Sequence, residues 1–282
     1  MIVKFYGTRG SIPVCDPAFG VFGGNTTCIA ILRKKTSRVA IIDAGTGIRN
    51  LGRDISSGAI QQEVINIGFT HFHWDHIQGF PFFSPAYNPR QKINVIALGK
   101  NRGIEDLKTI FEMQMQSAYF PVQLEKMGAQ FTFMAPDEEH FIASDEEEML
   151  DFYDGNVFTL RLNHPGGSYG YRIERDGKVL VICTDLEHGD QIDASVVAFA
   201  QGADLLVHEA QYTTEELATH RGWGHSSYEQ AIQVAEQAGV KQLVMTHHDP
   251  DHDDQFLREV EKTCQDRFPD CLLAREQMEI EV

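Results

Sequence analysis

The chain has 282 residues, with 41 acidic and 24 basic side chains and a formal net charge of −17. Its apolar share of 42% is enough for a sizeable core. It lacks the run of about 18 uncharged apolar residues that a membrane-spanning helix needs, and its opening residues do not resemble a signal peptide. Five cysteines without a Cys-x-x-Cys pair indicate free thiols, so a cytoplasmic protein is expected.

Strand and helix patterns form two similar halves. In the first half, strands are predicted at residues 2–7, 27–33, 38–43 and 64–70, and a helix over residues 102–119. In the second half, strands are predicted at residues 157–163, 169–174, 179–184, 204–208 and 242–246, with a helix over residues 227–238. No low-complexity linker separates the halves, so one α/β domain covering residues 1–282 is expected.

The segment Thr70–Gly79 holds three histidines and an aspartate within six residues, directly after a predicted strand. Residues two apart in an extended strand end point to the same side, so His71 and His73 can bind one ion together. Asp75 and His76 follow where the chain should turn into a helix. Imidazole and carboxylate groups are ligands of zinc and similar ions, and their spacing indicates two neighbouring metal ions. A cluster of surface histidines is the alternative, which so demanding a pattern disfavours.

The run His-Phe-His-Trp-Asp-His at residues 71–76 resembles the signature of the metallo-β-lactamase fold superfamily of metallohydrolases. The resemblance covers nearly the whole chain and implies a four-layer αββα sandwich. Candidates for the remaining ligands follow in matching order, at His164, Asp185 and His247. Asp43 matches an early strand-ending aspartate whose role is structural more than ligating.

The resemblance also implies how two divalent ions are held. One ion would be bound by His71, His73 and His164, the other by Asp75, His76 and His247, with Asp185 bridging the two. Such ions activate a shared water for hydrolysis, and Asp75 is therefore counted among the catalytic residues. Zinc is the expected metal, and the same ligands accept manganese or iron. His248 is an alternative to His247, although the preceding Leu-x-x-Thr pattern favours His247.

Two further segments are similar to the phosphodiesterase branch of this superfamily, which includes ribonuclease Z and cyclic-phosphate phosphodiesterases. They are the Gly-His-Ser-Ser run at residues 224–227 and the His-Glu-Ala run at residues 208–210. The resemblance implies that His225 donates a proton or a hydrogen bond to a phosphoryl oxygen and that Glu209 orients it. The alternative is that His225 only caps the following helix.

The N-terminal segments Phe5–Val14 and Gly23–Cys28 look like the opening of bacterial phosphodiesterase-type members. Glycine-rich loops can bring backbone N–H groups close to a phosphate, and Arg9 could add a bidentate contact to the same anion. Equally, these glycines permit tight turns while Arg9 pairs with an acidic neighbour. The sequence leaves both roles open.

Charge favours a small substrate. A protein that grips long nucleic acid needs a surface of lysines and arginines, and no basic stripe or tail is present. Residues 137–154 include nine acidic side chains, which would repel a polyanion near the active site or form a solvated loop. Ribonuclease Z proteins carry a long arm that grips tRNA, and no insertion of that composition is seen here.

These features predict a two-metal phosphodiesterase that acts on a small phosphodiester, with a cyclic nucleotide or cyclic ribose phosphate favoured. Extended nucleic acid and membranes are not expected as partners, and a homodimer is one assembly that the resembling branch suggests. The alternatives are RNA 3′ processing, hydrolysis of a lactone, thioester or β-lactam on the same fold, and a ligand-binding sensor without turnover.

Overall fold

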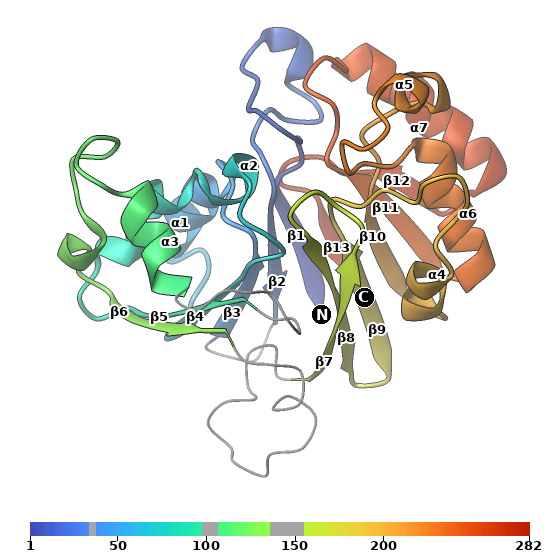
Figure 1. The fold of residues 1–282 in the computed structure, drawn as a ribbon. Helices are drawn as coiled ribbons and strands as arrows, with labels where there is room; N and C mark the ends of the chain where they lie inside the picture. The colour runs from blue at the N-terminus through green and yellow to red at the C-terminus, as the bar shows by residue number, and fades with distance from the viewer. Residues whose placement is uncertain (34–37, 98–106, 136–154) are drawn as a thin grey trace.

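Two β-sheets pack face to face in this protein, whose computed structural model describes residues 1–33, 38–97, 107–135 and 155–282 (Figure 1). Helices cover the outer face of each sheet, so the layers run helix, sheet, sheet, helix. This arrangement confirms the predicted αββα sandwich. No described helix is long and apolar enough to cross a membrane.

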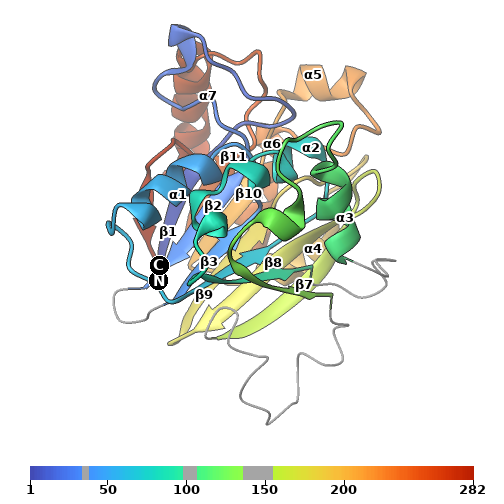
Figure 2. The same cartoon turned by 90° about the vertical axis from the view of Figure 1, so that its left-hand side faces the viewer.

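The first sheet has seven strands in the order β13-β1-β2-β3-β4-β5-β6. These strands are β1 Ile2–Gly7, β2 Cys28–Leu32, β3 Arg38–Ile42, β4 Val64–Gly68, β5 Lys92–Ile96, β6 Gln130–Met134 and β13 Glu279–Glu281. The pairs from β3 to β6 are parallel, and the others are antiparallel. Helices α1 (Ile48–Ser56) and α3 (Leu107–Gln114) lie over its outer face (Figure 2), and the short α2 (Trp74–Ile77) follows β4.

The second sheet has six strands in the order β12-β11-β10-β9-β8-β7. These strands are β7 Asn156–Leu162, β8 Ser168–Arg175, β9 Lys178–Cys183, β10 Leu205–Glu209, β11 Gln242–Thr246 and β12 Cys271–Leu273. The helices of this half are α4 Ala194–Ala200, α5 Thr214–Thr219, α6 Tyr228–Ala238 and α7 Asp254–Arg267. Strands β9 to β12 run parallel, so their carboxyl ends meet at one edge of the sheet.

Strand β9 shows why its sequence is apolar at successive positions. Leu180 and Ile182 point to the cluster between the two sheets, whereas Val181 and Cys183 point to the cluster beneath the helices. A strand that is buried on both faces cannot alternate apolar with polar residues. Its near-continuous apolar run therefore fixes β9 in the middle of the sandwich.

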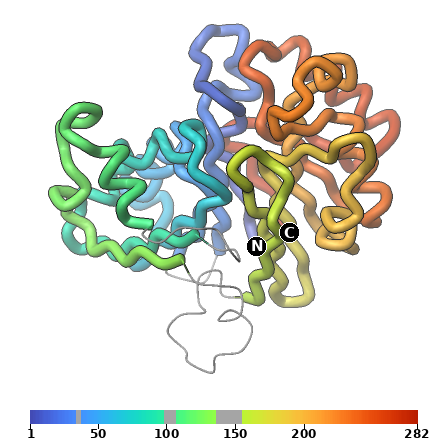
Figure 3. Tube along the Cα trace, viewed as in Figure 1, coloured from blue at the N-terminus to red at the C-terminus, as the bar shows by residue number. Residues whose placement is uncertain are grey.

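The two ends of the chain lie side by side at the edge of the first sheet (Figure 3). Ile2 of β1 pairs with Glu281 of β13, and the Val282 N–H donates to the Met1 carbonyl at 2.9 Å. The last described strand is therefore the neighbour of the first.

Most predicted elements agree with the structure to within two residues. The helix predicted over residues 102–119 is an exception, because α3 ends at Gln114 and Tyr119 is exposed; residues 98–106 lie outside the described part. The chain turns after α3 and reaches Pro121, which cannot continue a helix. Strands β5, β6, β12 and β13 were not predicted, and the last two have only three residues each, too few for a periodic pattern.

Candidate metal centre

The predicted ligands meet at one edge of the sandwich, where several strands end. His71 and His73 follow β4, Asp75 and His76 lie in α2, and the other three come from the second sheet. His164 follows β7, Asp185 follows β9, and His247 follows β11. Strands that run in the same direction deliver the residues after their carboxyl ends to the same edge, and this geometry brings distant parts of the chain together.

One group of possible ligand atoms comes from His71, His73 and His164, which lie within 4.8 Å of one another. Nε2 of His164 is 3.0 Å from Nδ1 of His73. Nε2 of His71 is buried and has no hydrogen-bond partner within the described residues. A buried nitrogen without a partner is costly in a folded protein, so this group fits a cation that would accept the nitrogen lone pairs.

A second group consists of Asp75, His76, Asp185 and His247, all buried. Nε2 of His247 lies 3.1 Å from Oδ2 of Asp75 and 3.4 Å from Nε2 of His76. The Ser11 N–H donates to the same Asp75 oxygen at 2.9 Å. Four converging donor atoms of nitrogen and oxygen form a set that suits a divalent ion.

Asp185, a member of the second group, also reaches the first and turns one oxygen to the histidines of each. Oδ2 is 3.6 Å from Nε2 of His71 and 3.9 Å from Nε2 of His164. Oδ1 is 3.2 Å from Nε2 of His76 and 3.3 Å from Nε2 of His247. The residue is only 1% exposed. A buried charge of this kind requires nearby positive charge, and two ions on either side would provide it.

Burial and charge act on the histidines in opposite ways. Burial lowers the pKa of His71 well below its ordinary value, and the neighbouring His76 lowers it further. Burial also opposes protonation of His76, but Asp185, Asp75 and Asp43 raise its pKa well above the ordinary value. The three carboxylates therefore favour positive charge at the centre of the cluster.

Hydrogen bonds outside the cluster fix the orientation of two histidines. His76 Nδ1 lies 2.7 Å from Oδ2 of Asp43, and the same carboxylate accepts bonds from Thr70 N and Oγ1. His164 Nδ1 lies 2.8 Å from the Gly224 carbonyl. Each ring thereby keeps Nε2 directed into the cluster, as metal-ligating histidines usually require. Asp43 lies outside both groups, in the structural role expected for it.

Three residues of the site have left-handed backbone conformations, with φ of 60° at Asp43, 47° at Asp185 and 62° at His247. Each follows the end of a strand. Such a conformation costs roughly 1–3 kcal/mol in a non-glycine residue and tends to occur at functional sites. The abrupt turn at each strand end is what directs the side chain across the edge of the sheet.

The structure distinguishes His247 from His248. His247 joins the second group, whereas Nε2 of the fully buried His248 donates to the Ala274 carbonyl at 2.9 Å. The left-handed backbone at His247, with φ of 62°, turns its side chain into the cluster, whereas the side chain of His248 is held by Ala274.

His225 lies beside both groups, with its ring centroid 5.4 Å from that of His164 and 5.1 Å from that of His247. Nδ1 of His225 is 3.7 Å from Oε1 of Glu209. Burial lowers the pKa of His225, but the carboxylate of Glu209, with those of Asp185 and Asp75, raises it to about 8.

Helix α6 is capped without His225. Ser227 is the N-cap residue and forms a capping box with Gln230, so the alternative role of His225 as a helix cap is wrong.

Glu209 is fully buried and accepts N–H bonds from Leu186, Gln211 and Ser226.

Arg9 does not lie in the cluster. It is 0% exposed, and its guanidinium donates to the carbonyls of Gly23, Asp249 and His252 at 2.7–2.9 Å. These bonds tie the N-terminal loop to the segment after β11. The structural role is therefore favoured over contact with a substrate phosphate, and its partners are main-chain carbonyls instead of an acidic side chain.

Glu187 and Gly224 have roles at the site that the sequence did not indicate. The Glu187 carboxylate accepts bonds from the N–H groups of Gly222 and Gly224. A side chain at Gly224 would collide with the His164 ring, because a Cβ atom there would lie 2.2 Å from Nδ1. Only two sequence features indicate this arrangement. They are Glu187, two positions after Asp185, and Gly224, directly before His225.

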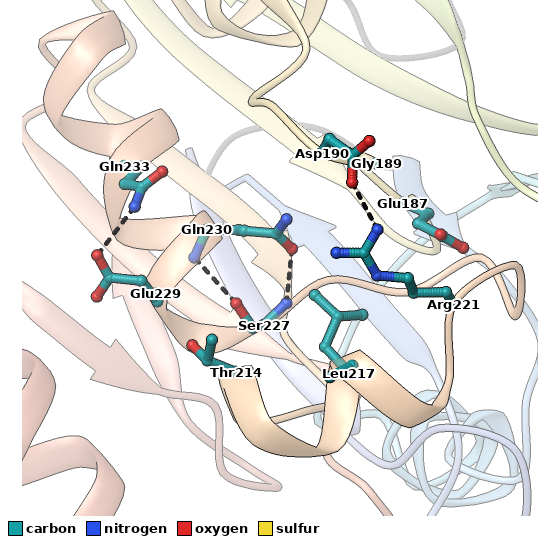
Figure 4. Close-up of a pocket in the computed structure, with 11 residues that line it drawn as sticks. Glu187, Gly189, Asp190, Thr214, Leu217, Arg221, Ser227, Glu229, Gln230 and Gln233 are labelled. Atoms are coloured by element: carbon teal, nitrogen blue, oxygen red, sulfur yellow. Dashed lines mark hydrogen bonds and ion pairs between the residues drawn. The ribbon is translucent and has the colours of Figure 1, made fainter.

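Glu187 also lines a pocket of about 320 Å³ between the loop after β9, helix α5 and the start of α6 (Figure 4). Two of its lining residues, Arg221 and Asp190, form an ion pair, as the dashed line shows. None of the seven predicted metal ligands lines this pocket.

The fold and the double His/Asp cluster define a metallohydrolase of the metallo-β-lactamase type. Residues 38–248 match the family model described as the beta-lactamase superfamily domain, and the chain belongs to this family. It is a metal-dependent hydrolase, and its cluster indicates a site for divalent metal ions.

Several relatives share nearly the full length of the chain. Ribonuclease BN of Enterobacter sp. (strain 638) is 25% identical over 331 residues, covering 99% of this chain and 99% of that protein. The crystal structure of the short form of human tRNase Z superposes with a TM-score of 0.66 at 19% identity, covering 100% and 99% of the two chains. A diphosphatase from the PhnP family superposes with a TM-score of 0.69 at 18% identity, covering 100% and 97%.

Metal content provides a direct test of the cluster. The wild-type chain, saturated with zinc and desalted, should contain two ions per chain by elemental analysis, and Asp185→Asn should lose both because the carboxylate faces both groups. Chelation should lower the melting temperature by several degrees, since ions bound only by the native state stabilise it. His220→Gln, outside both groups, should retain two ions. A wild-type content of one ion or none would contradict the two-ion assignment.

The role of Arg9 can be tested by stability. Arg9→Ala should lower the free energy of unfolding by about 3 kcal/mol, because three buried or partly buried carbonyls lose a charged donor. Chemical denaturation measures this loss, and Arg90→Ala, at an exposed arginine, should change stability by less than about 0.5 kcal/mol. A stable Arg9→Ala protein with a raised KM for a phosphodiester would instead assign Arg9 to substrate binding.

Proposed function

We propose that this protein is a dinuclear-metal phosphodiesterase that hydrolyses a small phosphodiester, with a cyclic nucleotide or cyclic ribose phosphate as the favoured substrate. The observation that carries the proposal is the Asp185 carboxylate, which turns one oxygen to each of two ligand groups. Two ions held in this way, zinc in the first place, would supply a nucleophile from water and offset the charge that develops on phosphorus.

The ligand residues would be divided between two metal ions, as their positions suggest. His71, His73 and His164 would hold one ion, and Asp75, His76 and His247 the other, with Asp185 shared. Asp75 is fixed by the Ser11 N–H and lies against His247, so it would also set the geometry of the second group. Asp43 and the Gly224 carbonyl would keep His76 and His164 in orientation.

His225 would act on the substrate beside these ions. With a pKa of about 8 it carries a proton at neutral pH, and only 8% of the residue is exposed. A positioned imidazolium can donate to a phosphoryl oxygen or protonate the leaving oxygen. Glu209 is held by three backbone N–H groups and would keep His225 both oriented and charged.

Two observations support a small substrate over a structured RNA. The formal charge of −17 opposes binding to a long polyanion. The alignment with ribonuclease BN spans 331 positions against 282 residues here, so that relative has segments with no counterpart in this chain. The acidic segment 137–154 lies outside the described residues. Binding to extended nucleic acid is therefore not part of the proposal, and a homodimer and a cytoplasmic location stay predictions.

RNA 3′ processing is the second candidate, favoured by the names of the relatives, ribonuclease BN and ribonuclease Z. Hydrolysis of a lactone, thioester or β-lactam ranks below both, because His225 and Glu209, whose side chains lie 3.7 Å apart, belong to the two segments that are similar to the phosphodiesterase branch.

The proposal is tested with bis-p-nitrophenyl phosphate, 3′,5′- and 2′,3′-cyclic nucleotides and a precursor tRNA, all at one salt concentration. Metallated wild type should hydrolyse the cyclic nucleotides faster than it cleaves the RNA, and Asp75→Ala should lower kcat by about 100-fold or more. Asp251→Ala, at an exposed aspartate, serves as the matched control. Cleavage of the RNA alone would instead support the second candidate, and no phosphodiester turnover would refute both.

The pairing of His225 and Glu209 gives a separate prediction. His225→Ala should lower kcat/KM for a cyclic nucleotide by roughly 100-fold while the chain retains two ions, because it removes a proton donor and no ligand. Glu209→Gln should lower the rate less and shift the basic limb of the pH–rate profile to lower pH, since the carboxylate that raises the pKa of His225 is neutralised. Loss of metal in His225→Ala would show that His225 is a ligand instead.

A further inference from the structure

Both tryptophans of this chain are exposed, and both lie beside the candidate metal centre. Trp74, which is 66% exposed, stands between His73 and Asp75. Trp223, which is 60% exposed, stands two residues before His225. Tryptophan is usually largely buried, so two exposed indoles next to predicted site residues in the sequence are informative about what the site binds.

The backbone around Trp223 is held rigidly although its ring faces solvent. The glycines on either side have φ of 83° at Gly222 and 91° at Gly224, a conformation that glycine adopts without strain. The Glu187 carboxylate accepts the N–H bonds of both glycines at 2.8–2.9 Å. Arg221 of the same loop pairs with Asp190, another residue that lines the pocket (Figure 4). Trp223 is therefore presented from a fixed support.

A series of ring contacts connects Trp223 with the metal centre. Its indole packs edge-on against His220, with centroids 4.8 Å apart. The His220 ring stacks on Tyr212 at 4.6 Å, and the Tyr212 ring lies 5.9 Å from that of His225. His225 in turn stacks against His247 at 5.1 Å. The exposed indole thus ends an aromatic series that begins at a predicted metal ligand.

We propose that Trp223 is a specificity-determining residue that stacks on the nucleobase of the substrate, with Trp74 as a second aromatic contact. The inference rests on the proposed phosphodiesterase function and narrows its substrate to a base-bearing phosphodiester instead of a plain ribose phosphate. An indole offers a flat face that any base can cover, and a rigid support reduces the entropy lost on stacking.

The charge of the chain agrees with a single nucleotide as ligand. Stacking does not depend on neutralising many phosphates, so it can operate in a protein with a formal charge of −17. The phosphodiester would lie at the metal centre next to the exposed His73, and the base would extend toward the rim where Trp223 stands.

A matched pair of substrates tests the inference by activity. Adenosine 2′,3′-cyclic phosphate and ribose 2,3-cyclic phosphate differ only in the base. The wild type should favour the adenosine compound in kcat/KM, and Trp223→Ala should lower that value by about tenfold or more while changing the ribose compound by less than about threefold. Trp223→Phe should recover most of the loss. Phe158→Ala, at an exposed phenylalanine on β7, is the control and should change neither value.

Fluorescence tests the same contact without turnover. In Trp74→Phe, Trp223 is the remaining tryptophan, and adenosine 5′-monophosphate should quench it saturably whereas ribose 5-phosphate should not. Equal effects of Trp223→Ala on both substrates, or no quenching by the adenosine compound, would overturn the stacking role, while hydrolysis of the ribose compound would leave the proposed function standing. Quenching in a protein that hydrolyses neither substrate would support the stacking role and refute the phosphodiesterase.

Discussion

The burial of Asp185 is the constraint on which the rest of the site depends. The carboxylate of a residue that is 1% exposed is stable only when positive charge or strong donors surround it. Four imidazole nitrogens come within 4 Å of its two oxygens, and they come from segments nearly 180 residues apart. The two sheets must therefore pack together before positive charge can surround the Asp185 carboxylate. The metal centre thus needs the packed sandwich, and the packed sandwich needs the metal centre to balance this buried charge.

Much of this arrangement could be predicted from the sequence, because each ligand follows a strand with a clear apolar pattern. The resemblance of residues 71–76 to the family signature implied His164, Asp185 and His247 as further ligands, and parallel strands deliver the residues after them to one edge. The sequence indicated less clearly which of His247 and His248 is the metal ligand. The distinction depends on the left-handed turn at His247, with φ of 62°, and the backbone angle of one residue leaves little trace in a local pattern.

Other features depend on partners that no local pattern reveals. Arg9 satisfies carbonyls some 240 positions away, so its own neighbours could not show whether it binds phosphate or supports a loop. Glu187 is one acid among many in the sequence, and only the fold places it against Gly222 and Gly224. Strands β12 and β13 are formed by pairing with β11 and β1 more than by their own three-residue sequences.

The pairing of β1 with β13 affects how the chain folds during its synthesis. Synthesis proceeds from the N-terminus, so β1 leaves the ribosome well before its outer partner, Glu279–Glu281. During that interval one edge of the first sheet offers free N–H and carbonyl groups, which is the situation in which strands of different molecules associate. The pairing of β1 with β13 also joins residues that are far apart in the sequence. Folding should therefore be slow and sensitive to crowding by other nascent chains.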